Sequence, residues 1–247
     1  MLTKSDLSRY GRQILYPSFG RQGQEKLKRS HVVVVGLGGL GTSSSIYLTC
    51  AGVGHITLVD CDHVELSNLN RQILHWDEDI GEEKPFSAAR KLAKLNPSIK
   101  ITPLFERITE GNVRDIIVGA DVVIDGMDNF ETRFALNSAC VAERIPFIHG
   151  GVYGLIGEVT TIISGETSCL SCIYPAAPEN RVRAFPVFGV TPALIATLQV
   201  TEAIKLLAGF GSLLTNKMLY IDGERMEFTI ADLAKRPECR VCGGSEP

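Results

Sequence analysis

A glycine-rich turn after a short apolar run is the feature that most restricts how this chain can fold. The run, 31–35, shows no alternation of polar and apolar residues, which is typical of a strand buried on both faces. Three glycines in GxGxxG spacing follow it: Gly36, Gly38 and Gly41. Residues 39–51 have a helical pattern, and Asp60 ends a second predicted strand, 56–60. This order predicts a nucleotide-binding unit in which a helix N-terminus faces phosphate.

Strands and helices continue to alternate up to about residue 150. We expect helix 85–95, strand 99–105, helix 112–118, strand 121–125, helix 129–143 and strand 146–149. The later segments are interpreted as antiparallel strands over 152–163, a loop over 173–190, a helix over 193–208, and short strands over 217–221 and 227–230. The pattern predicts an α/β fold, a Rossmann-like doubly wound and mainly parallel sheet extended by antiparallel strands. We interpret 1–247 as one domain, with a helical segment at 1–30, a nucleotide-binding half at 31–150 and a second half at 151–247.

Composition argues against several classes of protein. Lys and Arg number 25 and Asp and Glu number 28, so the formal net charge is −3, which disfavours a broad nucleic-acid-binding face. No apolar run reaches the ~20 residues that span a bilayer, and the first residues lack the apolar core of a signal peptide. We therefore expect a cytoplasmic protein with neither a membrane nor a nucleic acid as partner.

Polar and basic residues beyond the second strand bear on the choice between ATP and NAD. The residues concerned are Ser67, Asn68, Leu69, Asn70, Arg71, Gln72 and Lys84. A triphosphate needs cations for its outer charge and for the leaving pyrophosphate, whereas a dinucleotide is held largely by the glycine turn. Arg71 and Lys84 are therefore candidates for phosphate contacts. Without the motif described next, Arg71 and Lys84 would be interpreted as two solvated surface cations.

An acidic residue ends a later strand, in the stretch Asp125-Gly126-Met127-Asp128-Asn129. Polar residues at the carboxyl ends of parallel strands face the ligand crevice of such sheets. Asp128 is therefore a candidate ligand of Mg²⁺ on the phosphates, with Asn129 beside it. The alternative role of Asp128 is to cap the helix that follows.

The seven cysteines fall into two groups. Two CxxC pairs, Cys169 with Cys172 and Cys239 with Cys242, supply four thiolates, the ligand set of a closed structural zinc site. A redox CxxC or two disulfides are the alternatives. Cys50, Cys61 and Cys140 stand alone in predicted helix or strand, where we expect them to be small buried hydrophobes.

Together these motifs resemble the MoeB/ThiF (HesA) family of E1-like adenylyltransferases for ubiquitin-fold sulfur carriers. The resemblance rests on GLGGLG, LVDCDHVELSNLNRQ, Lys84, DGMDN, the two CxxC pairs, the opening RYGRQI and the late helix LQVTEAIKLLAG, and it runs from about Leu7 to Gly243. It implies that MgATP activates the C-terminal Gly-Gly carboxylate of a MoaD- or ThiS-like carrier, with release of pyrophosphate. An external donor then delivers sulfur for molybdopterin or thiamin synthesis.

The resemblance also implies roles for individual residues. Gly39 belongs to the nucleotide loop and Asp60 holds the ribose. Phosphate contacts fall to Asn68, Arg71 and Lys84, and Asp128 binds Mg²⁺. Arg12 resembles an arginine that enters the neighbouring subunit's ATP site, which implies a homodimer.

One departure from the family concerns the loop after the first CxxC. Some members carry a cysteine there that links to the carrier, but residues 173–190 contain none. We therefore expect the reaction to stop at the acyl-adenylate, and Arg181, Phe185 and Phe188 are candidates to clamp the carrier's tail. His149 is expected to be a hydrogen-bonded structural residue. An NAD-dependent oxidoreductase and adenylation of a carboxylate on modified tRNA remain as alternative functions.

Overall fold

A single sheet of eight strands runs through the computed structural model, which describes residues 1–175 and 185–243. In spatial order the strands are β3 (Lys100–Phe105), β2 (His55–Asp60), β1 (His31–Val35), β4 (Val122–Asp125), β5 (Phe147–Tyr153), β6 (Ile156–Ile162), β7 (Lys217–Asp222) and β8 (Glu227–Asp232). The pairs from β3 to β5 are parallel, and the pairs from β5 to β8 are antiparallel. The predicted α/β class and the change from parallel to antiparallel pairing are both confirmed.

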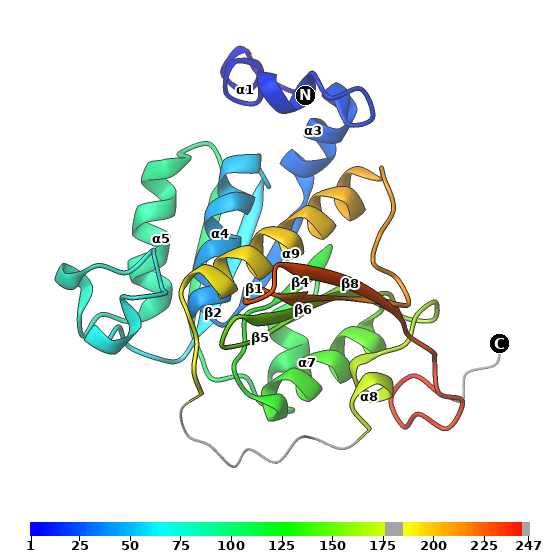
Figure 1. The fold of residues 1–247 in the computed structure, drawn as a ribbon. Coiled ribbons are helices and arrows are strands. Elements are labelled where there is room, and N and C mark those ends of the chain that lie inside the picture. The colour runs from blue at the N-terminus through cyan, green and yellow to red at the C-terminus, as the bar shows by residue number, and fades with distance from the viewer. Residues whose placement is uncertain (176–184, 244–247) are drawn as a thin grey trace.

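Helices cover both faces of this sheet (Figure 1). Those in the described residues are α1 (Lys4–Arg9), α2 (Gly11–Ile14), α3 (Gly20–Arg29), α4 (Gly39–Ala51), η1 (Leu66–Asn68), η2 (Asp77–Asp79), α5 (Lys84–Leu95), α6 (Val113–Ile117), α7 (Phe130–Glu143), α8 (Leu170–Ile173) and α9 (Val190–Ala208). One apolar core joins α4, α5 and α9 to the sheet, and a second joins α6, α7 and α8 to the opposite face. Burial on both faces explains why β1 contains no polar alternation.

Several boundaries differ from the predicted ones, for local physical reasons. Helix α9 begins at Val190 rather than 193, with Pro192 in its first turn. Proline is tolerated there because the first N–H groups of a helix have no partner within the helix. Strand β5 continues to Tyr153 because it pairs with β6 along its whole length, from Phe147 opposite Ile162 to Tyr153 opposite Ile156.

Helix α9 is by length and composition long and apolar enough to cross a membrane, with a mean hydropathy of 1.3. It packs instead against α4 and the inner strands β5 and β6. Ile195, Ala196 and Ala203 have no exposed surface. Its apolar character is therefore accounted for by its place in the core.

Two histidines stack at the opening ends of β1 and β2, with the ring centroids of His31 and His55 3.9 Å apart. Burial, together with the charges of His31 and Lys100, lowers the pKa of His55 to about 4. The folded protein therefore resists protonating this ring, while the unfolded chain protonates it near pH 6.5. The stabilising contribution is complete above pH 6.5 and is lost as the pH falls towards 4.

We expect a His55→Gln variant to show a weaker loss of stability in acid. Between pH 7 and pH 4.5 the free energy of unfolding, measured with urea, should fall by about 1 kcal/mol more in the unmodified protein than in the variant, once solvent screening is allowed for. His63→Gln, which changes an exposed histidine, serves as the control. Parallel pH curves for the unmodified protein and His55→Gln would contradict this assignment.

Candidate active site

The glycine turn between β1 and α4 packs directly against the end of β4. Gly36 has a φ of +88°, and a Cβ there would lie 2.6 Å from the carbonyl oxygen of Gly126. A Cβ on Gly41 would lie 1.7 Å from the carbonyl oxygen of Gly36. Side chains are excluded at these positions because backbones meet, so Gly41 allows close packing rather than lining a cavity.

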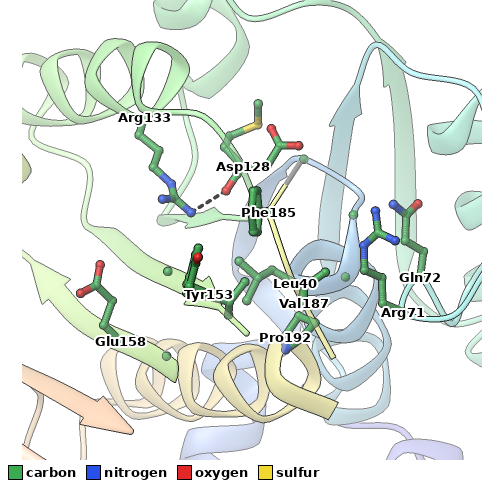
Figure 2. A pocket seen from close by; sticks show the side chains of 18 of the residues that line it. Leu40, Arg71, Gln72, Asp128, Arg133, Tyr153, Glu158, Phe185, Val187 and Pro192 are labelled. Atoms are coloured by element: carbon green, nitrogen blue, oxygen red, sulfur yellow. Dashed lines mark hydrogen bonds between the residues drawn. The ribbon is translucent and has the colours of Figure 1, made fainter. Parts of the chain in front are cut away.

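A large cavity of about 940 Å³ opens at the carboxyl ends of the parallel strands. Of the predicted site residues it is lined by Gly36, Gly38, Gly39, Asp60, Ser67, Asn70, Arg71, Lys84 and Asp128. Figure 2 shows Arg71 on one side of this cavity and Glu158 on the other, with Tyr153 and Phe185 between them. The fold thus brings most of the predicted residues to one place, although they come from five separate stretches of chain.

The cationic side of the large cavity is built by a turn and a helix start. Arg71 donates from Nη1 to the carbonyl oxygen of Ser67 at 2.8 Å and to Oδ1 of Asn70 at 3.2 Å. Lys84 opens α5 and is largely buried, with its Nζ 3.1 Å from Oδ2 of Asp62. Both cations are held in place by the protein before any ligand arrives.

Asp60 is tied to the glycine turn. Its Oδ2 accepts the backbone N–H of Leu37 at 2.6 Å, and its Oδ1 accepts that of Asp62 at 2.8 Å. Burial raises the pKa of Asp60, although Lys84 and these hydrogen bonds oppose the shift. A carboxylate oxygen accepts more than one hydrogen bond, so Asp60 can still receive hydroxyl donors.

The end of β4 divides two roles between neighbours. Asn129 caps α7 by accepting the Thr132 N–H at 2.9 Å, so the capping role considered for Asp128 belongs to Asn129. Asp128 is exposed, and its Oδ1 accepts a hydrogen bond of 3.4 Å from Asn129. Its oxygens therefore suit a hard cation such as Mg²⁺. Asn129 lines a small adjoining cavity of about 110 Å³, which shares Asp60 and Asp128 with the large one.

Besides Gly41, three residues predicted for the ATP site lie outside both cavity linings. Asn68 is buried, and its Oδ1 accepts the Glu65 N–H at 3.1 Å, so it shapes the turn that presents Arg71. Leu69 is half-buried beside it. Arg12 is exposed on α2, in the N-terminal helical segment that Figure 1 shows away from the sheet.

The lining also includes polar side chains that were not predicted from the sequence, among them Arg133, Tyr153 and Glu158. Arg133 lies one turn into α7, and side chains of a helix point towards its N-terminus, which is where the cavity lies. The direction of this side chain could therefore have been inferred from the sequence. Tyr153 and Glu158 are positioned by the pairing of β5 with β6, and local sequence does not predict the register of that pairing.

Arg133 and Glu158 also belong to a network of charged and polar side chains with the buried residues Asp125 and His149. Nδ1 of His149 lies 2.6 Å from Oδ2 of Asp125, and its Nε2 lies 3.3 Å from Oε1 of Glu158. Arg133 Nε lies 3.1 Å from the same Asp125 oxygen, and Tyr174 donates its hydroxyl to Glu158. Burial by itself lowers the pKa of His149, but its hydrogen bonds to the two carboxylates raise it by more. The predicted hydrogen bonding of His149 is therefore confirmed, and the side chain lies outside both cavity linings.

The candidate clamp residues are only partly described. Phe185 lines the large cavity, and its ring stacks on Tyr153 with centroids 6.5 Å apart. Phe188 is 59% exposed and is absent from that lining. Arg181 lies outside the described residues.

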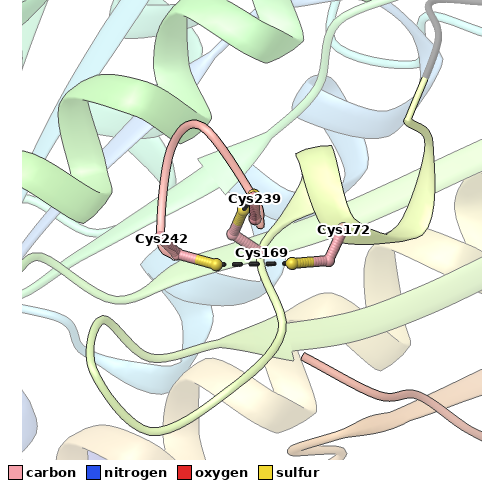
Figure 3. A group of neighbouring side chains, drawn as sticks. All are labelled: Cys169, Cys172, Cys239 and Cys242. Atoms are coloured by element: carbon pink, nitrogen blue, oxygen red, sulfur yellow. Dashed lines mark hydrogen bonds between the residues drawn. The ribbon is translucent and has the colours of Figure 1, made fainter. Parts of the chain in front are cut away.

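The two CxxC pairs face one another, as Figure 3 shows, with Cys169 and Cys172 at the short helix α8. The four sulfur atoms lie within 4.8 Å of one another and all four residues are buried. Sγ of Cys169 and Cys239 are 3.7 Å apart and those of Cys172 and Cys242 are 3.3 Å apart, too long for disulfides. The spacing fits four thiolates around one metal ion, because metal–sulfur bonds of ~2.3 Å place tetrahedral sulfurs ~3.8 Å apart.

The prediction for the lone cysteines was right for one and wrong for two. Cys140 is buried, and desolvation raises the pKa of its thiol. Cys50 is exposed because it lies on the solvent side of α4 near its end, and Cys61 is half-buried in the turn after β2, where it lines the small cavity. The prediction was wrong for these two residues because the sequence pattern did not identify which side of its element each one occupies.

The sequence pattern of the ThiF family matches residues 10–241. The chain belongs to the ThiF family. It is 41% identical to the SAMP-activating enzyme E1 of Haloferax volcanii over 98% of this chain and 91% of that protein. It is 40% identical to the sulfur carrier protein adenylyltransferase of Thermus thermophilus, over 98% and 92%. The solved structure of E. coli MccB with ATP superposes with a TM-score of 0.86 at 29% identity, over 95% of this chain and 73% of that one.

These relatives identify the protein as an enzyme of the adenylyltransferase type. The oxidoreductase alternative receives no support, because the relatives named above are adenylyltransferases or activating enzymes. The glycine turn and Asp60 by themselves did not distinguish these two classes.

Proposed function

We propose that the protein uses MgATP to adenylate the C-terminal Gly-Gly carboxylate of a ubiquitin-fold sulfur-carrier protein. The observation that carries the proposal is the continuity of the large cavity. It joins the glycine turn and two held cations at one end to the wall formed by Tyr153, Ile156 and Glu158 at the other. A nucleotide fits the first end, and an extended, side-chain-free peptide tail fits the second. Relatives named for sulfur carriers support this choice of substrate.

The nucleotide is placed by residues that the fold has already oriented. The N-terminus of α4 and the glycine turn receive phosphate through free N–H groups, and Asp60 receives the ribose hydroxyls. Arg71 and Lys84 neutralise the outer phosphates. Residues 67–70 shape the turn that holds Arg71, and the small cavity beside Asp60 and Asn129 extends the space for the base.

The reaction needs positioning and charge stabilisation rather than a general base. The carrier's carboxylate is already ionised and attacks the α-phosphorus, while the bond from that phosphorus to the bridging oxygen breaks and pyrophosphate leaves. Arg71 and Lys84 stabilise the charge that grows on the leaving group. Asp128 would hold Mg²⁺, which supplies further neutralisation when bound. An external donor then transfers sulfur to the activated carboxylate, in a pathway such as molybdopterin or thiamin synthesis.

We further propose that the four-cysteine cluster holds one Zn²⁺ with a structural role. Four thiolates leave no open coordination position for substrate, which separates this site from the chemistry. The metal would connect residues 239–242 to α8, and so hold the C-terminal end of the half at 151–247 against the rest of that half, which receives the carrier.

The test is pyrophosphate exchange into ATP in the presence of individual purified carriers. We expect exchange that depends on one carrier and disappears when its last glycine is removed, because the carboxylate then no longer reaches the α-phosphorus. The same carrier with an amidated C-terminus controls for binding without a nucleophile. Exchange that is equally fast without any carrier, or with the amidated one, would contradict the proposal.

We expect Arg12 to act in the partner subunit's site. Its exposed position on α2, away from the lining of its own cavity, motivates this role. Arg12→Ala and Asp128→Ala proteins should each be nearly inactive in carrier-dependent exchange. Mixing them should recover up to about a quarter of the activity, because half of the dimers formed are mixed and each has one complete site.

The mixing experiment has an internal control. Two Asp128→Ala preparations carrying different tags are mixed in the same way, so that subunit exchange is demonstrated by co-purification without any gain of activity. Exchange of subunits between the Arg12→Ala and Asp128→Ala proteins without recovery of activity would remove the role of Arg12 in the partner's site.

A further inference from the structure

The backbone of Leu37, inside the glycine turn, is held at both its N–H and its carbonyl oxygen. Its N–H donates to Oδ2 of Asp60 at 2.6 Å, and its carbonyl oxygen lies 3.3 Å from Nε2 of His75. Leu37 stands between Gly36 and Gly38, which both line the large cavity. Two glycines leave this turn many backbone conformations, so the side chains that grip Leu37 select the one that is presented to phosphate.

The hydrogen bonds of His75 fit a neutral ring that is protonated at Nε2. The carbonyl oxygen of Leu37 only accepts, so Nε2 carries the proton. Nδ1 lies 2.9 Å from the hydroxyl of Ser87, and that hydroxyl accepts a hydrogen bond of 3.0 Å from Nζ of Lys91. In the neutral form Ser87 donates to Nδ1, and every polar atom of this buried ring has a hydrogen-bond partner.

His75 also connects the two segments that carry the cations. Its backbone N–H donates to the carbonyl of Gln72 at 2.9 Å, in the same turn as Arg71. Its partner Ser87 lies one turn after Lys84 on α5. One imidazole thus contacts the glycine turn, belongs to the turn of Arg71, and contacts the helix of Lys84.

We infer that His75 is a positioning residue for the triphosphate end of the site, and that its neutral imidazole holds the glycine turn in register with Arg71 and Lys84. The inference rests on the proposed use of ATP and deepens it. His75 is only 2% exposed and does not line the large cavity, so it acts through Leu37 and not by touching the nucleotide.

The charges around the ring favour the neutral form. The pKa of His75 is lowered to about 4, chiefly by burial and also by the charges of Lys91 and Lys84 on α5, while the hydrogen bond to the Leu37 carbonyl opposes the shift. Asp79 of η2 opposes it but is paired with Lys91. A second proton would remove the acceptor for Ser87 and add a third cation beside the two lysines. The positioning contact is therefore retained at neutral pH.

The test compares His75→Leu with His75→Gln, because the glutamine amide can restore a donor near the position of Nε2. We expect His75→Leu to weaken MgATP binding, measured by calorimetry without carrier, by about 10-fold, the effect of one lost hydrogen bond. His75→Gln should bind within about threefold of the unmodified protein. KM for ATP in exchange should rise more than kcat falls, because the change loosens the ground-state site.

His55→Leu is the matched control. His55 also has a pKa lowered to about 4, but it begins β2, whereas Asp60 ends that strand beside the cavity. It should lower the melting temperature without changing MgATP affinity by more than about twofold. Equal loss of MgATP affinity in His55→Leu and His75→Leu, or no rescue by glutamine, would overturn the positioning role.

Two measurements without nucleotide separate this inference from the proposed function. Nitrogen NMR of the unmodified protein should show His75 as the neutral ring protonated at Nε2 at pH 7. Amide hydrogen exchange at residues 36–41 should accelerate in His75→Leu relative to His55→Leu. A charged ring or unchanged exchange would overturn the inference, whereas an unmodified protein that does not bind MgATP would overturn the proposed function.

Discussion

Alanine at Lys84, Arg71 or Asp128 should each lower carrier-dependent pyrophosphate exchange by about 10²–10³, with little change in fold. Removing one preorganised charged contact at a reacting centre costs ~3–4 kcal/mol of transition-state stabilisation. The fold should survive because the Lys84 partner Asp62 is exposed, Asp128 is itself exposed, and Arg71 contacts its own turn. Initial exchange rates at saturating carrier, together with melting temperatures, provide the measurement.

A matched control lies on the same helix as Lys84. Lys94 is exposed in the last turn of α5, ten residues after Lys84, and does not line the cavity. Lys94→Ala therefore removes the same charge from the same helix outside the site. Its exchange rate should stay within about twofold of the unmodified protein. Near-normal exchange in all three site variants would overturn the assignment of this cavity to ATP.

Replacing Cys239 by serine should abolish stoichiometric metal binding and strongly destabilise the protein. Loss of a bound metal is among the few single changes that cost more than ~4 kcal/mol, and for a chain of this size each kcal/mol shifts the melting temperature by about 2–4 °C. We therefore expect a fall of roughly 8–16 °C. Elemental analysis of protein purified without chelator should give one zinc per chain before the change and none after it.

Cys50→Ser provides the control for this prediction because Cys50 is exposed and far in sequence from both CxxC pairs. It should keep its zinc and its melting temperature. Binding of MgATP by Cys239→Ser at a temperature where the variant remains folded would support a purely structural role for the metal. The four cysteines of the CxxC pairs lie outside both cavity linings. Unmodified protein that contains no zinc would contradict the assignment of the metal.

The parts of the site that could be predicted lie on regular elements with a strong local signal. The glycine turn follows an unbroken apolar strand, and Asp60 ends the next one, so their meeting at one sheet edge follows from parallel topology. The misassigned cysteines show the opposite situation. Cys50 occupies the exposed side of α4, a helix that is buried over most of its surface and so has little amphipathic pattern to orient it.

The missed residues share another cause. Tyr153 and Glu158 reach the cavity only because β5 pairs with β6 in a register that puts Gly151 opposite Glu158. A slip of one residue would turn Glu158 to the other face of the sheet. His75 escaped notice for a related reason, because its partners Leu37 and Ser87 are 38 and 12 residues away along the chain.

The sequence by itself determined the α/β class, the order of the strands and the main helices, the glycine turn and the pairing of four cysteines into two motifs, because each depends on residues close together in the chain. The tertiary structure alone decided which side chains share a cavity, how Arg133, His149 and Glu158 form one charge network, and which cysteines are accessible. Strand register and helix rotation set these contacts, and both are chosen by packing across the whole core rather than by local propensity.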